Sequence, residues 1–66
     1  MRHFLFYERI SGENFIVGEE LFGDACEAAE GIAREIGLDY NGGEFELMFI
    51  EELTEEEAEA SGYDEY

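Results

Sequence analysis

The chain has 66 residues and a formal net charge of −16, with 19 Asp and Glu residues against three Arg and no Lys. Nucleic acid and anionic membranes would be repelled by such a surface, so neither is expected as a direct partner. A basic protein surface is the natural complement. Hydrophobic residues make up 45% of the chain and aromatic residues 15%, too many for a disordered acidic tail. We expect a single folded domain over residues 1–66, with a thin core.

The cysteine content and the start of the chain bear on location. Cys26 is the only cysteine, so no internal disulfide can form, as is typical of intracellular proteins. The first residues lead directly into a strand-like run and do not resemble a signal peptide. No stretch approaches the roughly 18 apolar residues of a membrane span. We expect a cytoplasmic protein, in a host cell if a phage encodes it.

Two strand-like runs occupy the first part of the chain. Residues 3–9 (HFLFYER) alternate large apolar side chains between two faces. Residues 11–14 are turn-forming, and a second strand-like run extends from Phe15 to about Glu19. Two such runs around a short loop that contains Gly predict an antiparallel hairpin.

The main helix is expected from about Asp24 to Ile36. Asp24 as N-cap and Glu27 three residues later match a capping box. Gly37 occupies the position of a left-handed C-cap, and residues 39–43 are expected to form a loop. Apolar residues recur at helical spacing and form one stripe, made of Ala25, Ala28, Ala29, Ile32 and Ile36. The small alanine side chains of this stripe imply that the helix packs close to a sheet.

The longest strand is expected from Glu44 to Leu53. Strict alternation places Phe45, Leu47 and Phe49 on one face. The opposite face is mixed but largely acidic and carries Glu44, Glu46, Met48, Ile50 and Glu52.

A short acidic helix is expected after this strand. Thr54 and Glu57 match a second capping box, with Leu53 and Ala58 placed as a hydrophobic staple. The helix would run from Glu55 to about Ala60 and end at Ser61-Gly62. Residues 61–66 are expected to be frayed unless a tyrosine ring docks.

This order of elements predicts an α+β fold, a small three-stranded antiparallel sheet (ββαβ) with one main helix on one face. We expect strand order 2-1-3, with a parallel pairing of the second and third strands as the alternative. One sheet face would then lack a helix. That face would carry either the Phe4 and Phe6 set or the set of Leu5, Tyr7 and Ile16. Exposed apolar area often marks an interface, so a homodimer through this face is a competing hypothesis.

The sequence contains no recognisable catalytic, metal-binding or cofactor-binding set. His3 is the only histidine, and Cys26 has neither a histidine nearby nor a second cysteine. A calcium loop starting at Asp39 would need oxygen ligands at its fifth and twelfth positions, which are Gly43 and Ile50. Paired carboxylates can hydrolyse glycosides only around a cleft, which a chain this small hardly builds. We expect no enzyme activity, no metal and no cofactor.

The carboxylates of the second half of the chain are the main functional signal. No Lys or Arg follows Arg34, so nothing local neutralises them. Double-stranded DNA carries about one negative charge per 1.7 Å of axis, and carboxylates along a strand and a helix can approximate such a row. A guanidinium can pair with Glu bidentately, as it does with phosphate. The residues predicted to contact a partner are Glu44, Glu46, Glu51, Glu52, Glu55, Glu56, Glu59, Asp64 and Glu65, extended by Glu19 and Glu20 at the end of the hairpin.

In size, net charge and single-helix α+β plan, the chain resembles the small acidic inhibitors of phages and mobile elements, the anti-CRISPR and anti-restriction DNA mimics. The resemblance covers the whole chain and carries no specific motif, so no residue is mapped from the family. It implies a non-enzymatic inhibitor that occupies the basic nucleic-acid-binding surface of a nuclease complex. The competing hypotheses are a structural or adaptor module that acts through its apolar sheet face, and acidity that serves only solubility or growth in high salt.

Overall fold

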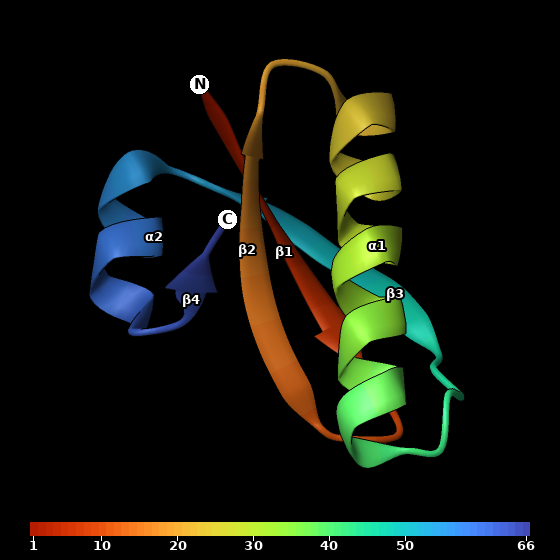
Figure 1. Cartoon of the computed structure of the whole chain (residues 1–66). Helices are drawn as coiled ribbons and strands as arrows, with labels where there is room; N and C mark the ends of the chain where they lie inside the picture. Colours follow the sequence, from red (N-terminus) through yellow and green to blue (C-terminus); the bar gives the residue numbers. More distant parts are fainter.

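The computed structural model describes the whole chain, Met1–Tyr66. It has an α+β fold, in which α1 packs along one face of a curved sheet and α2 lies beyond the end of β3 (Figure 1). The elements in chain order are β1 (Arg2–Glu8), β2 (Glu13–Glu19), α1 (Phe22–Tyr40), β3 (Leu47–Leu53), α2 (Glu55–Ser61) and β4 (Asp64–Glu65). Neither helix is long and apolar enough to cross a membrane.

The sheet has four strands in the order β3-β1-β2-β4 and is mixed. β1 and β2 form the expected antiparallel hairpin, with Phe4 opposite Val17 and Phe6 opposite Phe15. β3 pairs antiparallel with β1, so the predicted 2-1-3 order is confirmed for the first three strands. The prediction of a three-stranded, purely antiparallel sheet is wrong, because β4 adds parallel to β2.

The C-terminal tail forms this fourth strand because Tyr66 docks on β2. The Tyr66 N–H donates to the Ile16 carbonyl at 2.7 Å, and the Gly18 N–H donates to the Tyr66 carbonyl at 2.9 Å. The Tyr66 ring meets Phe15 edge-on, with ring centroids 5.9 Å apart. Residues 61–66 were expected to be frayed unless a tyrosine ring docks. The Tyr66 ring docks on Phe15, so this condition is met.

A β-bulge at Ile50 changes the face that each side chain of β3 occupies. Phe49 lies opposite Phe6, but Glu51 lies opposite Leu5, so Ile50 has no partner in β1. Side chains of a strand alternate between the two faces of the sheet. One extra residue therefore moves every later side chain of β3 to the face opposite to the one that strict alternation predicts. The predicted strict alternation from Glu44 to Leu53 is therefore wrong. β3 begins only at Leu47, and Glu52 lies on the same sheet face as Phe49.

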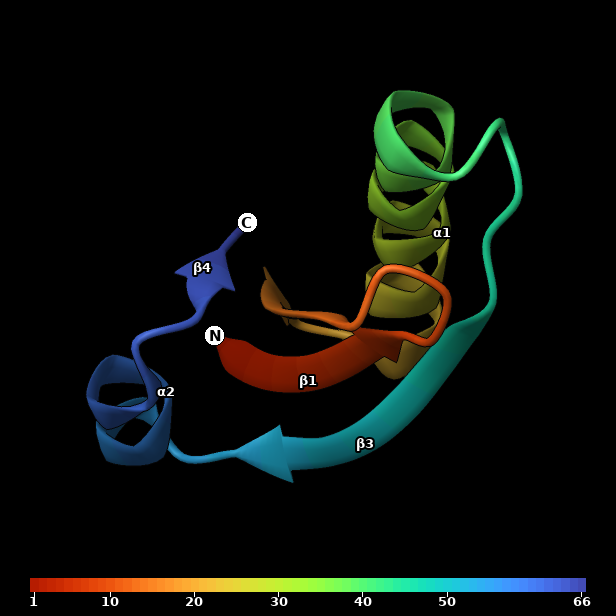
Figure 2. The same ribbon diagram turned by 90° about the horizontal axis from the view of Figure 1, so that it is seen from below.

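The core lies on both faces of the sheet. The α1 face holds the larger cluster, made of Phe4, Phe6, Phe15, Val17, Ala25 and Ala29. On the other face Leu5 and Ile16 pack against Ala58 of α2 and are 8% and 0% exposed. The expectation that one face lacks a helix is wrong, because α2 folds back over that end of the sheet (Figure 2). Alanine at the contact points of both helices allows close approach to the strands.

α1 begins earlier than predicted. Its N-cap is Leu21, which makes no capping hydrogen bond, so Asp24 lies inside the first turn and the predicted Asp24–Glu27 capping box is wrong. The early start places the centroid of the Phe22 ring 5.5 Å from that of Phe4 and 4.8 Å from that of Phe49. This aromatic packing outweighs the local capping signal. Asp24 still suits the positive end of the helix dipole.

α1 also ends later than predicted, at Tyr40 with Asn41 as C-cap. Gly37 is a buried residue inside the helix and not its left-handed cap. A Cβ atom at this position would lie 2.5 Å from the carbonyl oxygen of Glu44. Gly37 is thus needed for the close approach of the following loop, and Gly42 and Gly43 adopt the positive φ angles that turn the chain.

α2 begins and ends as predicted. The Glu57 N–H donates to the Thr54 hydroxyl at 3.1 Å, and the Thr54 N–H donates to the Glu57 carboxylate at 2.9 Å. Gly62 is the left-handed C-cap, and Leu53 packs on the cluster that contains Ala58. Local sequence signals were sufficient here because every partner lies within a few residues.

Two glycines of α1 carry opposite stability predictions. Gly37→Ala forces a methyl group against the Glu44 carbonyl, so we expect a loss of about 1–3 kcal/mol in the free energy of unfolding. Gly31→Ala meets no atom within 4 Å, so we expect a gain of about 0.5–1 kcal/mol. Urea unfolding followed by circular dichroism measures both. A Gly37→Ala variant that is as stable as the native chain would contradict the role given to Gly37.

Candidate functional site

Almost all of the negative charge lies on the surface. Glu8 is the only buried carboxylate and Glu19 is half-buried, which leaves 17 of the 19 exposed. Each arginine already contacts a carboxylate, in the pairs Arg2–Glu52 at 2.9 Å, Arg34–Glu30 at 3.1 Å and Arg9–Glu46 at 3.7 Å. No arginine remains to neutralise the others, so the surface is strongly and unevenly negative.

The fold gathers several of the predicted residues around Arg2, at the end of the sheet next to α2. Arg2 lies opposite Glu19 in the hairpin. Its side chain donates to the Glu52 carboxylate at 2.9 and 3.0 Å and to the Glu20 carbonyl at 3.3 Å. Glu55 lines the same surface depression as Arg2 and Glu52. We call this group the Arg2 end, made of Glu19, Glu20, Glu52 and Glu55.

α2 continues this negative surface. Its buried side is fixed by Ala58, the only buried residue of the helix. Glu55 and Glu59 are four residues apart, and Glu56 and Glu59 are three apart, so the three share one side of the helix. All three are exposed and none forms an ion pair with an arginine.

The remaining predicted residues lie elsewhere, so the predicted set does not form one face. Glu44 and Glu46 precede β3, at the opposite end of that strand from α2. Asp64 belongs to β4, at the sheet edge farthest from β3. Glu65 reaches His3, with 3.2 Å between the carboxylate and Nδ1. Glu51 and Glu52 are consecutive strand residues and lie on opposite faces of the sheet, with Glu51 opposite Leu5 on the α2 side and Glu52 opposite Phe4 on the α1 side.

A cavity of about 260 Å³ opens between α1 and the β2–β4 edge. It combines carboxylates with aromatic rings and contains no basic residue. Its lining is Glu13, Asn14, Phe15, Ile32, Glu35, Ile36, Asp39, Tyr40, Asp64 and Tyr66. Of these only Asp64 was predicted from the sequence, because the cavity exists only once α1 extends to Tyr40 and the tail docks on β2.

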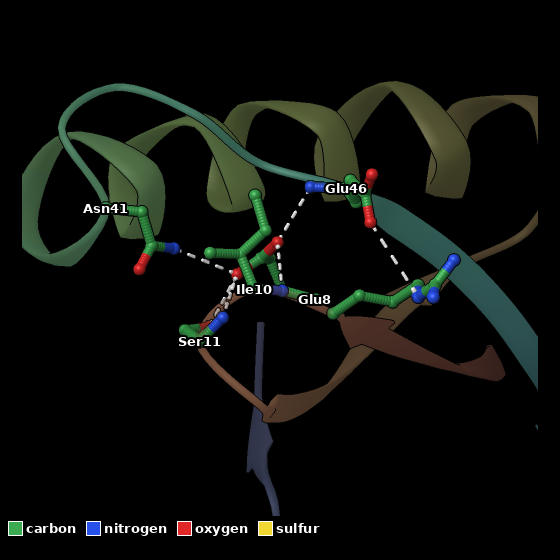
Figure 3. Close-up of polar contacts among 6 residues, drawn as sticks. Glu8, Ile10, Ser11, Asn41 and Glu46 are labelled. Atoms are coloured by element: carbon green, nitrogen blue, oxygen red, sulfur yellow. Dashed lines mark hydrogen bonds and ion pairs between the residues drawn. The ribbon is translucent and has the colours of Figure 1, made fainter.

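The buried carboxylate of Glu8 positions the entry into β3 (Figure 3). One oxygen accepts hydrogen bonds from the Ser11 N–H at 2.7 Å, the Ser11 hydroxyl at 2.6 Å and the Asn41 side chain at 3.1 Å. The other accepts from the Ile10 N–H at 3.1 Å and the Glu46 N–H at 2.7 Å. Glu8 thereby ties the hairpin turn, the C-terminus of α1 and the start of β3 to one point.

These hydrogen bonds determine the charge of Glu8. Burial by itself raises the pKa of Glu8, but donors from Glu46, Ser11 and Ile10 stabilise the ionised form and lower the pKa to about 2. Glu8 is therefore ionised at neutral pH. No local pattern in the sequence predicts this role, because Asn41 and Glu46 are 33 and 38 residues away from Glu8.

The described side chains contain no group of three or more His, Cys, Asp or Glu residues placed to hold a metal ion. Comparison with known protein families, with curated proteins and with solved structures found no match.

Replacing Glu8 tests its structural role. Glu8→Gln puts an N–H₂ group against backbone N–H donors, so we expect a loss of about 2–4 kcal/mol in the free energy of unfolding. The control is Glu13→Gln, an exposed carboxylate at the start of β2, with an expected effect within about 0.5 kcal/mol. Denaturant titration at neutral pH measures both. Equal losses in the two variants would contradict the account.

The difference in the free energy of unfolding between the native chain and Glu8→Gln should depend on pH, which gives an independent test. The pKa of Glu8 is about 2 in the fold and about 4.3 in an unfolded chain. Its ionised form thus stabilises the fold fully above the unfolded value, and this contribution is lost as the pH falls through about 2. The stability difference between the native chain and Glu8→Gln should be constant near neutral pH and shrink between about pH 4.5 and 2. A difference that already shrinks near pH 6 would contradict the assignment.

Proposed function

We propose that the protein is a non-enzymatic inhibitor that binds the basic, nucleic-acid-binding surface of another protein in place of DNA. The target class is a nuclease complex of a host defence system, such as a CRISPR or restriction complex. The observation that carries this proposal is the negative surface formed by the Arg2 end and α2, in which one arginine stands among the carboxylates.

The spacing of these charges suits a surface that normally holds phosphates. Carboxylates four residues apart on α2 are about 6 Å apart along the helix axis, and two steps along one DNA strand rise about 6.8 Å. The molecule is 34 Å in its longest dimension, close to one turn of duplex DNA. A groove lined by Arg and Lys would therefore meet Glu55 and Glu59 at a spacing close to that of every second phosphate along one strand.

The exposed negative charge also lowers the stability of the fold. Repulsion among unpaired like charges destabilises a compact state, and a chain of this size has little stability in reserve. A surface that is costly to the fold is retained more readily when it serves binding. Such a surface also accelerates association with a basic partner through long-range attraction.

The competing hypothesis of an adaptor that acts through an apolar sheet face has less support. Leu5 and Ile16, which would form that face, are buried under α2. The part of the face formed by these two residues is therefore not accessible, and the apolar side chains of the sheet that remain exposed lie along β3, at Met48, Phe49 and Ile50.

The proposal is tested by affinity capture from a bacterial lysate, with elution in a salt gradient and identification by mass spectrometry. We expect a nucleic-acid-binding complex that is released by salt or by competing duplex DNA, because exposed charges are screened beyond about 8–10 Å at moderate ionic strength. A partner that stays bound in high salt, or recovery of this chain alone, would contradict the proposal.

Charge reversal identifies the surface that binds. The test variant combines Glu51→Lys, Glu56→Lys and Glu59→Lys, and the control variant makes the same net change on α1 with Glu27→Lys, Glu35→Lys and Asp39→Lys. We expect the test variant to lose at least about 100-fold in affinity for the captured partner and the control to lose less than about tenfold. Titration calorimetry measures both after circular dichroism has established that they fold. Equal losses would mean that net charge alone matters and that the surface around α2 is not the site.

A further inference from the structure

The outer edge of β3 has no partner strand. β3 is seven residues long and pairs only with β1. Figure 2 shows it as the outermost strand of the curved sheet, with no helix or strand along its outer side. Alternate backbone N–H and C=O groups of such a strand point away from the sheet and can pair with another chain. The opposite sheet edge offers only the two residues of β4.

Large apolar side chains are exposed along this edge. Met48, Phe49 and Ile50, at the middle of β3, are 43%, 41% and 44% exposed. On the α1 side, Phe49 packs edge-on against Phe22, which is itself 42% exposed. On the other side, Met48 lies opposite Tyr7. An added strand would therefore find apolar surface on both faces of the sheet.

The charge around this edge selects the kind of strand that can bind. Carboxylates flank the apolar centre at both ends, and only Glu46 and Glu52 among them meet an arginine. The flanking residues are Glu44, Glu46, Glu51, Glu52 and Glu55. A second copy of this chain would bring the same residues and a further charge of −16 against them, and like charges across a strand pair are destabilising. A strand that carries Lys or Arg would instead form opposite-charge pairs.

Acidic side chains and a bulge also protect an edge strand from aggregation, which is their usual role. The carboxylates act against acidic strands but attract a basic strand. The bulge at Ile50 acts on any added strand and leaves regular pairing to the residues on either side of it.

We infer that the β3 edge accepts an extended segment of a partner protein, in which Lys or Arg alternates with apolar residues, as an additional strand of the sheet. Main-chain hydrogen bonds would provide the affinity, and the alternating side chains would provide the specificity. The inference rests on the proposed function and identifies one contact within it, a basic strand or extended loop that borders the nucleic-acid-binding surface of the target.

The probe is a capped peptide of about ten residues in which Lys and Val alternate. A control peptide with alternating Lys and Pro has the same charge but cannot join a strand ladder, because proline lacks the N–H donor. NMR titration and amide hydrogen exchange at low salt report both binding and the site. We expect the Lys-Val peptide to bind at least about tenfold more tightly and to slow exchange of the outward-facing β3 amides.

Protein variants provide a matched control. Met48→Lys introduces a positive charge at the centre of the edge and should weaken binding of the Lys-Val peptide at least about tenfold. Glu27→Gln makes the same net change in charge on α1 and should leave binding within about twofold.

The outcomes separate this inference from the proposed function. Equal binding of the two peptides without protection of β3 would overturn the edge site and leave binding through surface charge intact. Absence of binding by either peptide would overturn the edge site and count against the proposed function as well. A dimer by light scattering with protected β3 amides in the free protein would overturn the inference in favour of a second copy.

Discussion

The hydrogen bonds around the Glu8 carboxylate are the interaction on which the rest of the structure depends. Five donors from the hairpin turn, Asn41 and the entry to β3 converge on this one buried charge. They compensate the desolvation that burial imposes on a carboxylate, which would otherwise strongly destabilise the fold. They also fix the position at which β3 starts. The Arg9 N–H donates to the Glu46 carbonyl at 2.9 Å, so the entry to β3 is held beside the end of β1 from both sides of Glu46.

The exposed carboxylates destabilise the fold, whereas the buried carboxylate of Glu8 stabilises it. They are exposed, they repel one another, and three arginines neutralise only a few of them. The core that opposes this repulsion is small but lies on both faces of the sheet, with alanines of both helices in contact with the strands. Both proposals made for this protein use the same property. Unpaired negative charge repels nucleic acid and further copies of the chain, and it attracts a basic protein surface.

Sequence patterns predicted the elements whose determinants are local. The hairpin and both caps of α2 depend on residues within a few positions of one another, and they were predicted correctly. The ends of α1 were not, because Phe22 and Gly37 are placed by contacts with Phe49 and Glu44. The bulge at Ile50 and the β2–β4 pairing also arise from long-range contacts. For the same reason the predicted acidic residues divide between the Arg2 end, the surface around α2, the entry to β3 and β4.

The central claim is that this protein and DNA compete for one surface of a target. The most direct measurement is the apparent Kd of the captured target for a labelled duplex of about 20 base pairs, at increasing concentrations of this protein and constant salt. Mutually exclusive binding predicts that the apparent Kd rises in proportion to the concentration of this protein, without a plateau. A plateau, or a complex that contains target, duplex and this protein together, would contradict the claim.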